Sequence, residues 1–246
     1  MSKTIVFILA AITAIAVFAG GLYAFTSIKQ GSNKSVSYEN MLKGVEHYVN
    51  STVKINKSKV IYIDPYLIKG EPVDADIVFV THTHFDHFSI QDIKKVMKED
   101  ATLVVTTDGV KAAKKAGIKD IVEVEPMKEY KAKGIEFETV PAYNTSHSKS
   151  KKWVGYIIKV DNIRYYAAGD TDNIPEMSTI KCDVAFLPVG GNYTMSAKDA
   201  LDAVNIIKPF IAVPVHFGEV AGTYKDAEEF VNGLGEDIRG ALLQKQ

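Results

Sequence analysis

The stretch VFVTHTHFDHFSI, residues 78–90, places three of the six histidines of the chain and one aspartate within six positions. It continues an apolar run, DIVFV at 76–80, that is typical of a buried β-strand. In an extended segment, side chains two residues apart point the same way, so three of these polar side chains converge while the fourth turns in as the next helix begins. Imidazole nitrogen and carboxylate oxygen are ligands that suit zinc, manganese or iron. The stretch therefore predicts a metal site with four candidate ligands: His82, His84, Asp86 and His87.

Three further candidate ligands lie far away in the sequence. His216 ends the apolar run IAVPVHF, and Asp170 ends the run YYAAGD, where Gly169 allows a sharp turn. His147 lies in the loop PAYNTSHSKS between two predicted strands. Together with the four clustered residues, these three give seven candidate ligands. Seven ligands are more than one ion needs, which favours two ions sharing a cavity. The sixth histidine, His47, precedes the first predicted strand and is expected to be solvated or hydrogen-bonded locally.

The composition limits the class of protein. With 246 residues, 46% of them hydrophobic, the chain can bury one substantial core. The formal net charge is −1, so the sequence does not favour nucleic acid or an anionic surface as a partner. Cys182 is the single cysteine, which excludes an intramolecular disulfide and a cysteine-rich zinc site.

The N-terminal segment is apolar. Residues 4–28 carry no charge, and as a helix of about 1.5 Å per residue they reach roughly 37 Å, enough for a hydrocarbon core of about 30 Å. We expect residues 1–30 to form a membrane anchor with the rest of the chain outside, or alternatively a signal segment that is cleaved. A linker at 31–44 and a folded domain at 45–246 follow.

The strands and helices predicted along the chain alternate irregularly. Strands are expected at 51–55, 59–64, 76–80, 102–107, 121–126, 135–140, 153–160, 162–168, 182–189 and 211–217. Capped helices are expected from Ser89, Asp108 and Ser196, and a last helix over 226–234. The pattern favours an α/β sandwich of two mixed sheets faced by helices over a single parallel sheet.

The motifs THTHFDH, GDTD and PVHFG, with a histidine between them, resemble the metallo-β-lactamase fold superfamily of metal-dependent hydrolases. The segments KVIYIDPY, WVGYII, GDTDNIPEM and AFLPVGGNYTM are similar to its small-hydrolase branch, which includes ascorbate-6-phosphate lactonase-like proteins. The resemblance spans residue 45 to the C-terminus. It implies a four-layer αββα sandwich with two divalent metal ions, zinc being expected and manganese or iron the alternatives.

The resemblance also implies how the ligands divide between two ions. The first ion would be held by His82, His84 and His147, the second by Asp86, His87 and His216, and Asp170 would bridge them. Asn144 is the positional substitute for His147, although an amide is a poor ligand for these metals.

The implied reaction uses a metal-bridged hydroxide as the nucleophile. Asp86 and Asp170 are the expected catalytic carboxylates, with Asp86 taking up the proton. Asp64 is expected either to orient a ligand histidine or to belong to an Asp-Pro turn. Asn192 and Tyr193 either face the substrate or form a structural turn.

Several functions fit this reading. The first is hydrolysis of an ester, lactone or phosphoester in a small molecule, and the alternatives are a membrane-surface phospholipid hydrolase and a non-catalytic metal-binding protein. Di-iron redox relatives resemble H-x-E-x-D, and His84 in this chain counts against that class. Nucleic-acid-processing relatives carry an additional domain or arm for which the chain has no room. The oligomeric state is left open.

Overall fold

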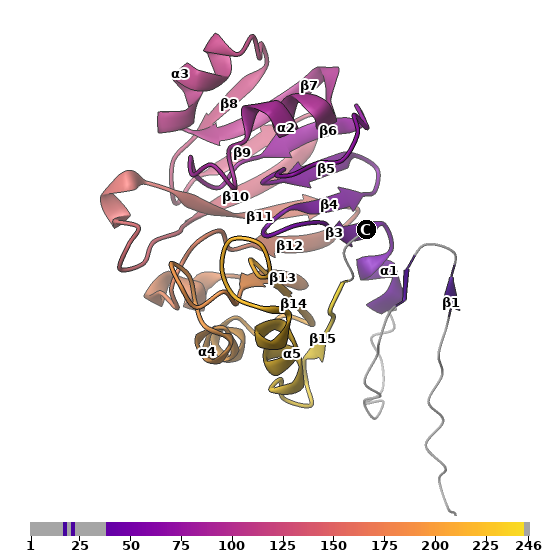
Figure 1. The fold of residues 1–246 in the computed structure, drawn as a ribbon, viewed down its shortest axis with the longest axis vertical. Helices are drawn as coiled ribbons and strands as arrows, with labels where there is room; N and C mark the ends of the chain where they lie inside the picture. The colour runs from indigo at the N-terminus through magenta and orange to yellow at the C-terminus, as the bar shows by residue number, and fades with distance from the viewer. Residues whose placement is uncertain (1–16, 19–20, 23–37, 244–246) are drawn as a thin grey trace, which may run out of the picture.

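The computed structural model describes residues 17–18, 21–22 and 38–243. The centre of the fold is formed by two mixed sheets packed face to face (Figure 1). The six-stranded sheet has the order β3-β4-β5-β6-β7-β8. Its strands are β3 (Val45–His47), β4 (Val53–Asn56), β5 (Val60–Ile63), β6 (Ala75–Phe79), β7 (Met97–Thr106) and β8 (Ile121–Val124). The seven-stranded sheet has the order β15-β14-β13-β12-β11-β10-β9. Its strands are β9 (Glu129–Ala132), β10 (Ile135–Pro141), β11 (Val154–Val160), β12 (Ile163–Ala167), β13 (Val184–Pro188), β14 (Ile211–Val215) and β15 (Arg239–Gly240).

Both sheets are part parallel and part antiparallel. β5 to β8 run parallel in the first sheet and β12 to β15 in the second, while the remaining pairs are antiparallel hairpins. Because the carboxyl ends of parallel strands meet at one edge of a sheet, the loops after β5, β6, β12, β13 and β14 can build a common site. The prediction of two mixed sheets in an α/β fold is confirmed.

Alternating apolar residues explain the layering. On β6, Phe79 packs into the core between the sheets, where its ring centroid lies 4.9 Å from that of Phe137 and 5.0 Å from that of Tyr156. Its neighbours Val78 and Val80 point the opposite way, into a separate cluster with Ile93 of α2. Burial of both faces is why these strands appear in the sequence as continuous apolar runs.

Helices cover the outer faces (Figure 1). α2 (Ile90–Val96) and α3 (Thr107–Lys115) lie on the first sheet, and α4 (Ala197–Ile207) and α5 (Tyr224–Asn232) lie on the second. Ser196 caps α4 in a complete capping box with Asp199, as the sequence predicts. A short helix α1 (Tyr38–Leu42) adds to the inter-sheet core, and two 3₁₀ turns span Lys149–Lys151 and Pro175–Thr179.

Some element limits differ from those predicted. β7 begins at Met97, directly after α2, whereas the sequence predicts a strand from 102. The short edge strands β3 and β9 were not predicted, because a strand of three or four residues leaves almost no periodic pattern. α5 begins after Thr223, which caps it through Asp226, so the predicted start at Asp226 is the third residue of the helix.

The predicted localisation is wrong, both as a membrane-anchored chain with its catalytic domain outside and as a chain secreted after signal cleavage. Within the part of the chain that the structure describes, no helix has the length and apolar character needed to span a bilayer. Residues 17–18 and 21–22 are β1 and β2, which pair antiparallel, with Val17 opposite Leu22. A hairpin at this position interrupts the continuous helix predicted over 4–28. The rest of that predicted helix lies outside the described residues.

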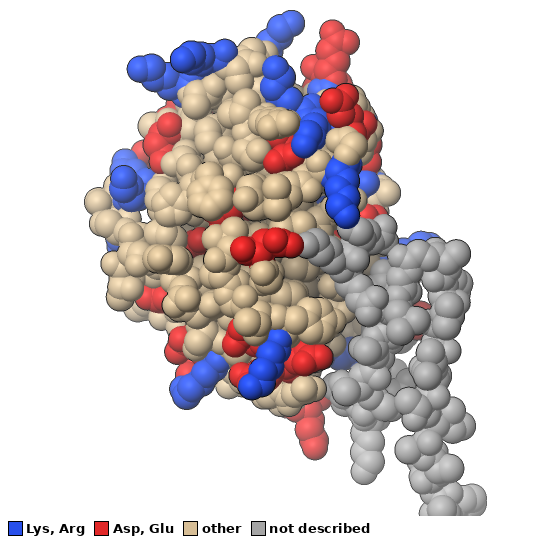
Figure 2. Space-filling view, viewed as in Figure 1, with Lys and Arg blue, Asp and Glu red and all other residues tan. Residues whose placement is uncertain are grey.

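Surface charges of opposite sign are paired. Examples are Lys98 with Asp76 at 2.9 Å and Arg164 with Glu138 at 3.0 Å. On the face shown in Figure 2, lysine and arginine side chains lie mainly toward the periphery, and the middle is largely uncharged. Exposed pairs of this kind contribute about 0–1 kcal/mol each, so the stability of the fold rests on the apolar core.

Candidate metal centre

The turn after β6 aims the clustered ligands inward. The carbonyl of His84 accepts hydrogen bonds from the backbone N–H of His87 at 3.1 Å and of Phe88 at 2.8 Å. Ser89 then caps α2, accepting a hydrogen bond from the backbone of Asp92. The turn is therefore anchored by a central strand on one side and by a capped helix on the other.

Asp170 reaches the same place from the second sheet. It follows β12 after Gly169, whose φ is +66° and where an added Cβ would lie 3.0 Å from the Cβ of Thr81. Glycine is required here because the backbone turns in the left-handed region against the loop that carries His82. His216 follows β14 in a left-handed conformation, with φ of +56°, and His147 lies in the loop after β10.

All seven predicted ligands are brought together. Their potential ligand atoms form three groups, in each of which the atoms lie within 4.8 Å of one another. The groups are His82 with His87 and Asp170, His84 with His147 and Asp170, and Asp86 with His87 and His216. Asp170 belongs to two of the groups, a position that suits a bridging carboxylate.

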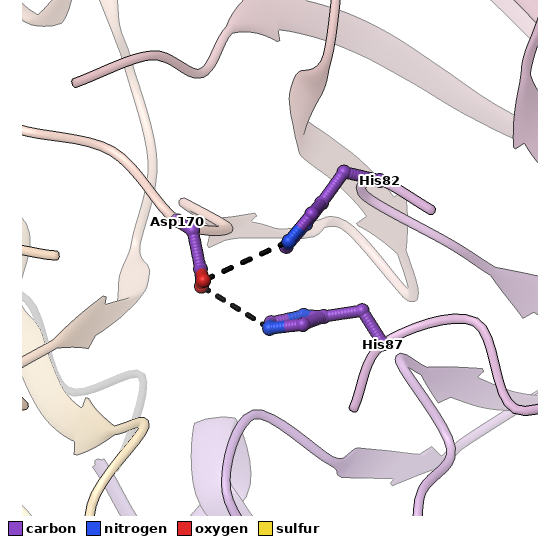
Figure 3. A group of neighbouring side chains, drawn as sticks. All are labelled: His82, His87 and Asp170. Atoms are coloured by element: carbon purple, nitrogen blue, oxygen red, sulfur yellow. Dashed lines mark ion pairs between the residues drawn. The ribbon is translucent and has the colours of Figure 1, made fainter. Parts of the chain in front are cut away.

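The shortest contacts involve Asp170 and Asp86. Figure 3 shows the Asp170 carboxylate facing two imidazoles, with Oδ1 3.2 Å from Nε2 of His87 and Oδ2 3.7 Å from Nε2 of His82. Nε2 of His216 lies 3.3 Å from Asp170 Oδ2 and 3.5 Å from Asp86 Oδ2. Nε2 of His87 also lies 3.3 Å from Asp86 Oδ2, so both carboxylates contact the same two histidines.

These residues fit a metal ion. Five of their buried atoms have no hydrogen-bond partner: His82 Nε2, His87 Nε2, Asp170 Oδ1, His216 Nδ1 and His216 Nε2. The three Nε2 atoms lie 3.2–3.7 Å from the Asp170 carboxylate, whereas His216 Nδ1 lies on the side of its ring near Gly190. Buried polar groups are nearly always paired. Nitrogen and oxygen atoms that converge without bonding one another are what a shared cation requires.

The electrostatics point the same way. Burial by itself raises the pKa of Asp170, but His87, His216 and His82 outweigh it and hold that pKa well below its usual range. Burial lowers the pKa of His216, yet Asp170 and Asp86 raise it to about 9. The buried carboxylates thus attract positive charge, which a cation can supply in place of protons.

Asp64 orients His87. Its Oδ2 lies 2.8 Å from Nδ1 of His87 and accepts a hydrogen bond of 2.7 Å from the hydroxyl of Thr81, whose backbone N–H donates to Oδ1 at 2.8 Å. These contacts match the expected orienting carboxylate and direct Nε2 of His87 toward the other ligands.

Two neighbours of the site were missed by sequence reasoning. Asn50 is fully buried, and its Nδ2 donates to Asp86 Oδ2 at 2.8 Å, while its carbonyl accepts from the backbone N–H of His216 at 2.7 Å. Trp153 packs its ring centroid 4.7 Å from those of His82 and His84. A lone Asn in a turn and a Trp opening a strand give no local signal of a site.

The remaining candidates are also placed. His47 is 3% exposed with Nε2 2.7 Å from the carbonyl of Asn50, so it is hydrogen-bonded locally rather than solvated. Asn144 lies beside His147, with Nδ2 2.9 Å from Nδ1 of that ring, so both side chains are at the site and His147 as the ligand stays a prediction. Asn192 and Tyr193 are both exposed at the loop after β13.

Known proteins are similar to this chain in sequence. The model of the family described as "Beta-lactamase superfamily domain" matches residues 45–216. A UPF0173 metal-dependent hydrolase of Methanopyrus kandleri is 32% identical over 75% of this chain and 89% of its own length.

Solved structures agree on the fold. A protein from Parabacteroides distasonis assigned as a metal-dependent hydrolase superposes with a TM-score of 0.66 at 28% identity, covering 82% of this chain and 93% of its own. The di-iron β-hydroxylase CmlA from Streptomyces venezuelae superposes with a TM-score of 0.62 at 16% identity, covering 76% of this chain and 50% of its own. The second likeness concerns the fold alone.

Proposed function

The chain belongs to the β-lactamase superfamily domain family and is a metal-dependent hydrolase, and we propose that it binds two divalent ions and hydrolyses an ester, lactone or phosphoester bond in a small substrate. Zinc is the proposed ion, with manganese or iron as the alternatives, because the ligand set is imidazole and carboxylate without cysteine. A membrane-surface phospholipid hydrolase finds no support among the described residues.

One observation carries the two-ion proposal. The seven side chains supply more ligand atoms than one ion can use, and Asp170 shares a group with ligands on both sides. We assign His82, His84 and His147 to one ion and Asp86, His87 and His216 to the other, with Asp170 between them. The unpartnered atoms of His82, His87, His216 and Asp170 support a bound cation, and the division between two ions follows the family resemblance.

When bound by these ligands, two divalent ions would supply an activated water and would polarise the oxygen of the bond to be cleaved. The remaining work falls to the chain itself. Asn50 holds Oδ2 of Asp86, and we assign to Oδ1 the uptake of the proton from the attacking water and its transfer to the leaving group. Asp64 keeps a proton on Nδ1 of His87 so that Nε2 stays free. Trp153 excludes water from one side of His82 and His84.

The proposal is tested by metal analysis of protein purified without chelator, followed by hydrolysis assays. The substrates are γ-butyrolactone, 4-nitrophenyl acetate and bis(4-nitrophenyl) phosphate. We expect about two ions per chain, about one in His147→Ala, and turnover of one of the three substrates that Asp86→Asn abolishes.

A matched control is Asp76→Asn, which changes a carboxylate at the far end of β6 from the metal centre and should retain metal and turnover. A ratio near one ion per chain that His147→Ala leaves unchanged would contradict the two-ion assignment. Full metal loading without turnover of any substrate would favour the non-catalytic alternative.

A further inference from the structure

Three aromatic residues lie in loops next to residues of the metal centre, and we name them the aromatic rim: Tyr66, Phe85 and Tyr193. Phe85 is 66% exposed and Tyr193 is 63% exposed, and Leu67 beside Tyr66 is 50% exposed. Exposed apolar side chains are ordinary when they are scattered singly. Here they gather in segments next to a buried polar site, which is where a substrate must enter.

Phe85 is held outward by the turn that directs its neighbours inward. It lies between His84 and Asp86, and the hydrogen bonds from His87 and Phe88 to the carbonyl of His84 close the turn. The ring of Tyr66 meets the ring of Phe85 edge to face, with centroids 5.9 Å apart and an interplanar angle of 74°. This geometry is a favourable one for aromatic pairs, so the two rings form one apolar surface.

The segment that carries Tyr66 is fixed in place. The backbone N–H of Tyr66 donates to the hydroxyl of Thr52 at 3.0 Å, and that of Leu67 donates to Asp92 at 3.0 Å. Leu67 has φ of +51°, a conformation that costs a branched residue about 1–3 kcal/mol and persists where the surroundings enforce it. This side of the rim is therefore preorganised before any ligand arrives.

Tyr193 approaches from the second sheet and is tied to the same centre. It has φ of +65°, and its carbonyl accepts a hydrogen bond of 2.6 Å from Nδ2 of Asn144. The same Nδ2 lies 2.9 Å from Nδ1 of His147. The position of Tyr193 is thereby linked to that of a metal-site histidine.

The rim offers a charged group no partner. Its apolar surface includes the paired rings of Tyr66 and Phe85, and partial burial, with the carboxylates of Asp86, Asp92 and Glu219, raises the pKa of the Tyr66 hydroxyl and keeps it neutral. Moving an anionic group from water onto such a surface without a partner costs free energy. An uncharged apolar group meets no such penalty.

We propose that the aromatic rim binds an uncharged aromatic or bulky aliphatic group next to the bond that is cleaved, so the substrate is an apolar ester, lactone or phosphoester. This inference rests on the proposed function, since it assumes that the reacting bond lies at the metal centre. Apolar contacts usually discriminate between substrates by about 10-fold or more. We therefore expect the rim to favour a bulky apolar group over a small one by about 10-fold.

The test measures binding rather than turnover. The zinc-loaded chain is titrated calorimetrically with methylphosphonate, phenylphosphonate and 4-carboxyphenylphosphonate, whose shared oxyanion group addresses the metal centre. We expect phenylphosphonate to bind about 10-fold more tightly than methylphosphonate, and the added carboxylate to remove most of that gain. Phe85→Ala and Tyr193→Ala, each tested separately, should bring the ratio of the methylphosphonate and phenylphosphonate dissociation constants toward one, with the zinc content unchanged.

The matched control is Phe210→Ala. Phe210 is also a partly exposed phenylalanine, 41% exposed, but it precedes β14 at the end of that strand opposite His216. Equal affinity for methyl- and phenylphosphonate would contradict the proposed role of the aromatic rim, and so would an undiminished preference for phenylphosphonate in both rim variants. Either result would leave the two-ion hydrolase proposal standing. Failure of all three phosphonates to bind would overturn both. An inactive protein that still prefers phenylphosphonate would support the rim while refuting the hydrolysis.

Discussion

Replacing Asp64 by asparagine should weaken metal binding without unfolding the chain. The backbone N–H of Thr81 donates to Oδ1 of Asp64 at 2.8 Å, so the oxygen of the new amide must stay at that position. The amide nitrogen then replaces Oδ2, the atom that lies 2.8 Å from Nδ1 of His87. Two N–H donors cannot face one another, so the proton of His87 must move from Nδ1 to Nε2.

That shift places the proton on the atom predicted to bind the metal. Nε2 of His87 lies 3.2 Å from Asp170 Oδ1 and 3.3 Å from Asp86 Oδ2, in the middle of the ligand groups. A hydrogen bond to a charged group is worth about 1.5–3 kcal/mol, and loss of an orienting partner usually lowers metal affinity by about 10–100-fold. These figures agree, because about 2 kcal/mol corresponds to roughly 30-fold in a dissociation constant.

The assay is competition for zinc between the apo chain and a chromophoric chelator, with far-UV circular dichroism to verify folding. Asp76→Asn serves as the control, because Asp76 also accepts a backbone hydrogen bond, of 2.8 Å from Val60, but begins β6 at the end away from the ligands. Unchanged zinc affinity in folded Asp64→Asn would refute the reasoning.

Three further outcomes are expected. Asn50→Gly retains the left-handed backbone but removes the side chain that donates a hydrogen bond to Asp86. It should lower zinc affinity about 10-fold in the same competition assay. Equal affinity would show that this hydrogen bond does not position Asp86. Tyr156→Phe removes a 2.7 Å hydrogen bond to the carbonyl of Val80 across the two sheets. It should reduce the free energy of unfolding, measured in urea, by about 1–2 kcal/mol. A reduction below about 0.5 kcal/mol would show that this hydrogen bond adds little to stability. Burial raises the pKa of Cys182 to about 12, so near pH 8 little of it is thiolate. Because a thiolate of higher pKa is also more nucleophilic, alkylation by iodoacetamide should be roughly 50-fold slower in the folded chain than in urea. Comparable rates, read by mass spectrometry, would contradict that burial.

Local patterns predicted the parts of the fold and site that depend on neighbouring residues. The strand and turn at 76–90 are encoded by an apolar run, a polar turn and the Ser89 cap, and the structure has each of them. The family resemblance drawn from the motifs is confirmed by the match over residues 45–216. The roles of the seven ligands remain predictions, although the structure brings their atoms within reach of one another.

The N-terminal prediction shows where local pattern misled. Hydropathy over 4–28 predicts a helix, yet β1 and β2 pair within that range. Apolar content measures only the tendency to leave water and does not distinguish a helix from a hairpin, because both satisfy the backbone hydrogen bonds.

The sequence by itself determined which residues can carry metal chemistry, since ligand type and strand-end position are local properties. Tertiary structure decided which residues support them. Asn50 contacts Asp86 across 36 positions of the chain, and Tyr66 meets Phe85 because the loops after β5 and β6 emerge side by side from parallel strands. Such contacts depend on strand order and on the register of the two sheets. Those features arise from packing of the whole core, and no short stretch of sequence records them.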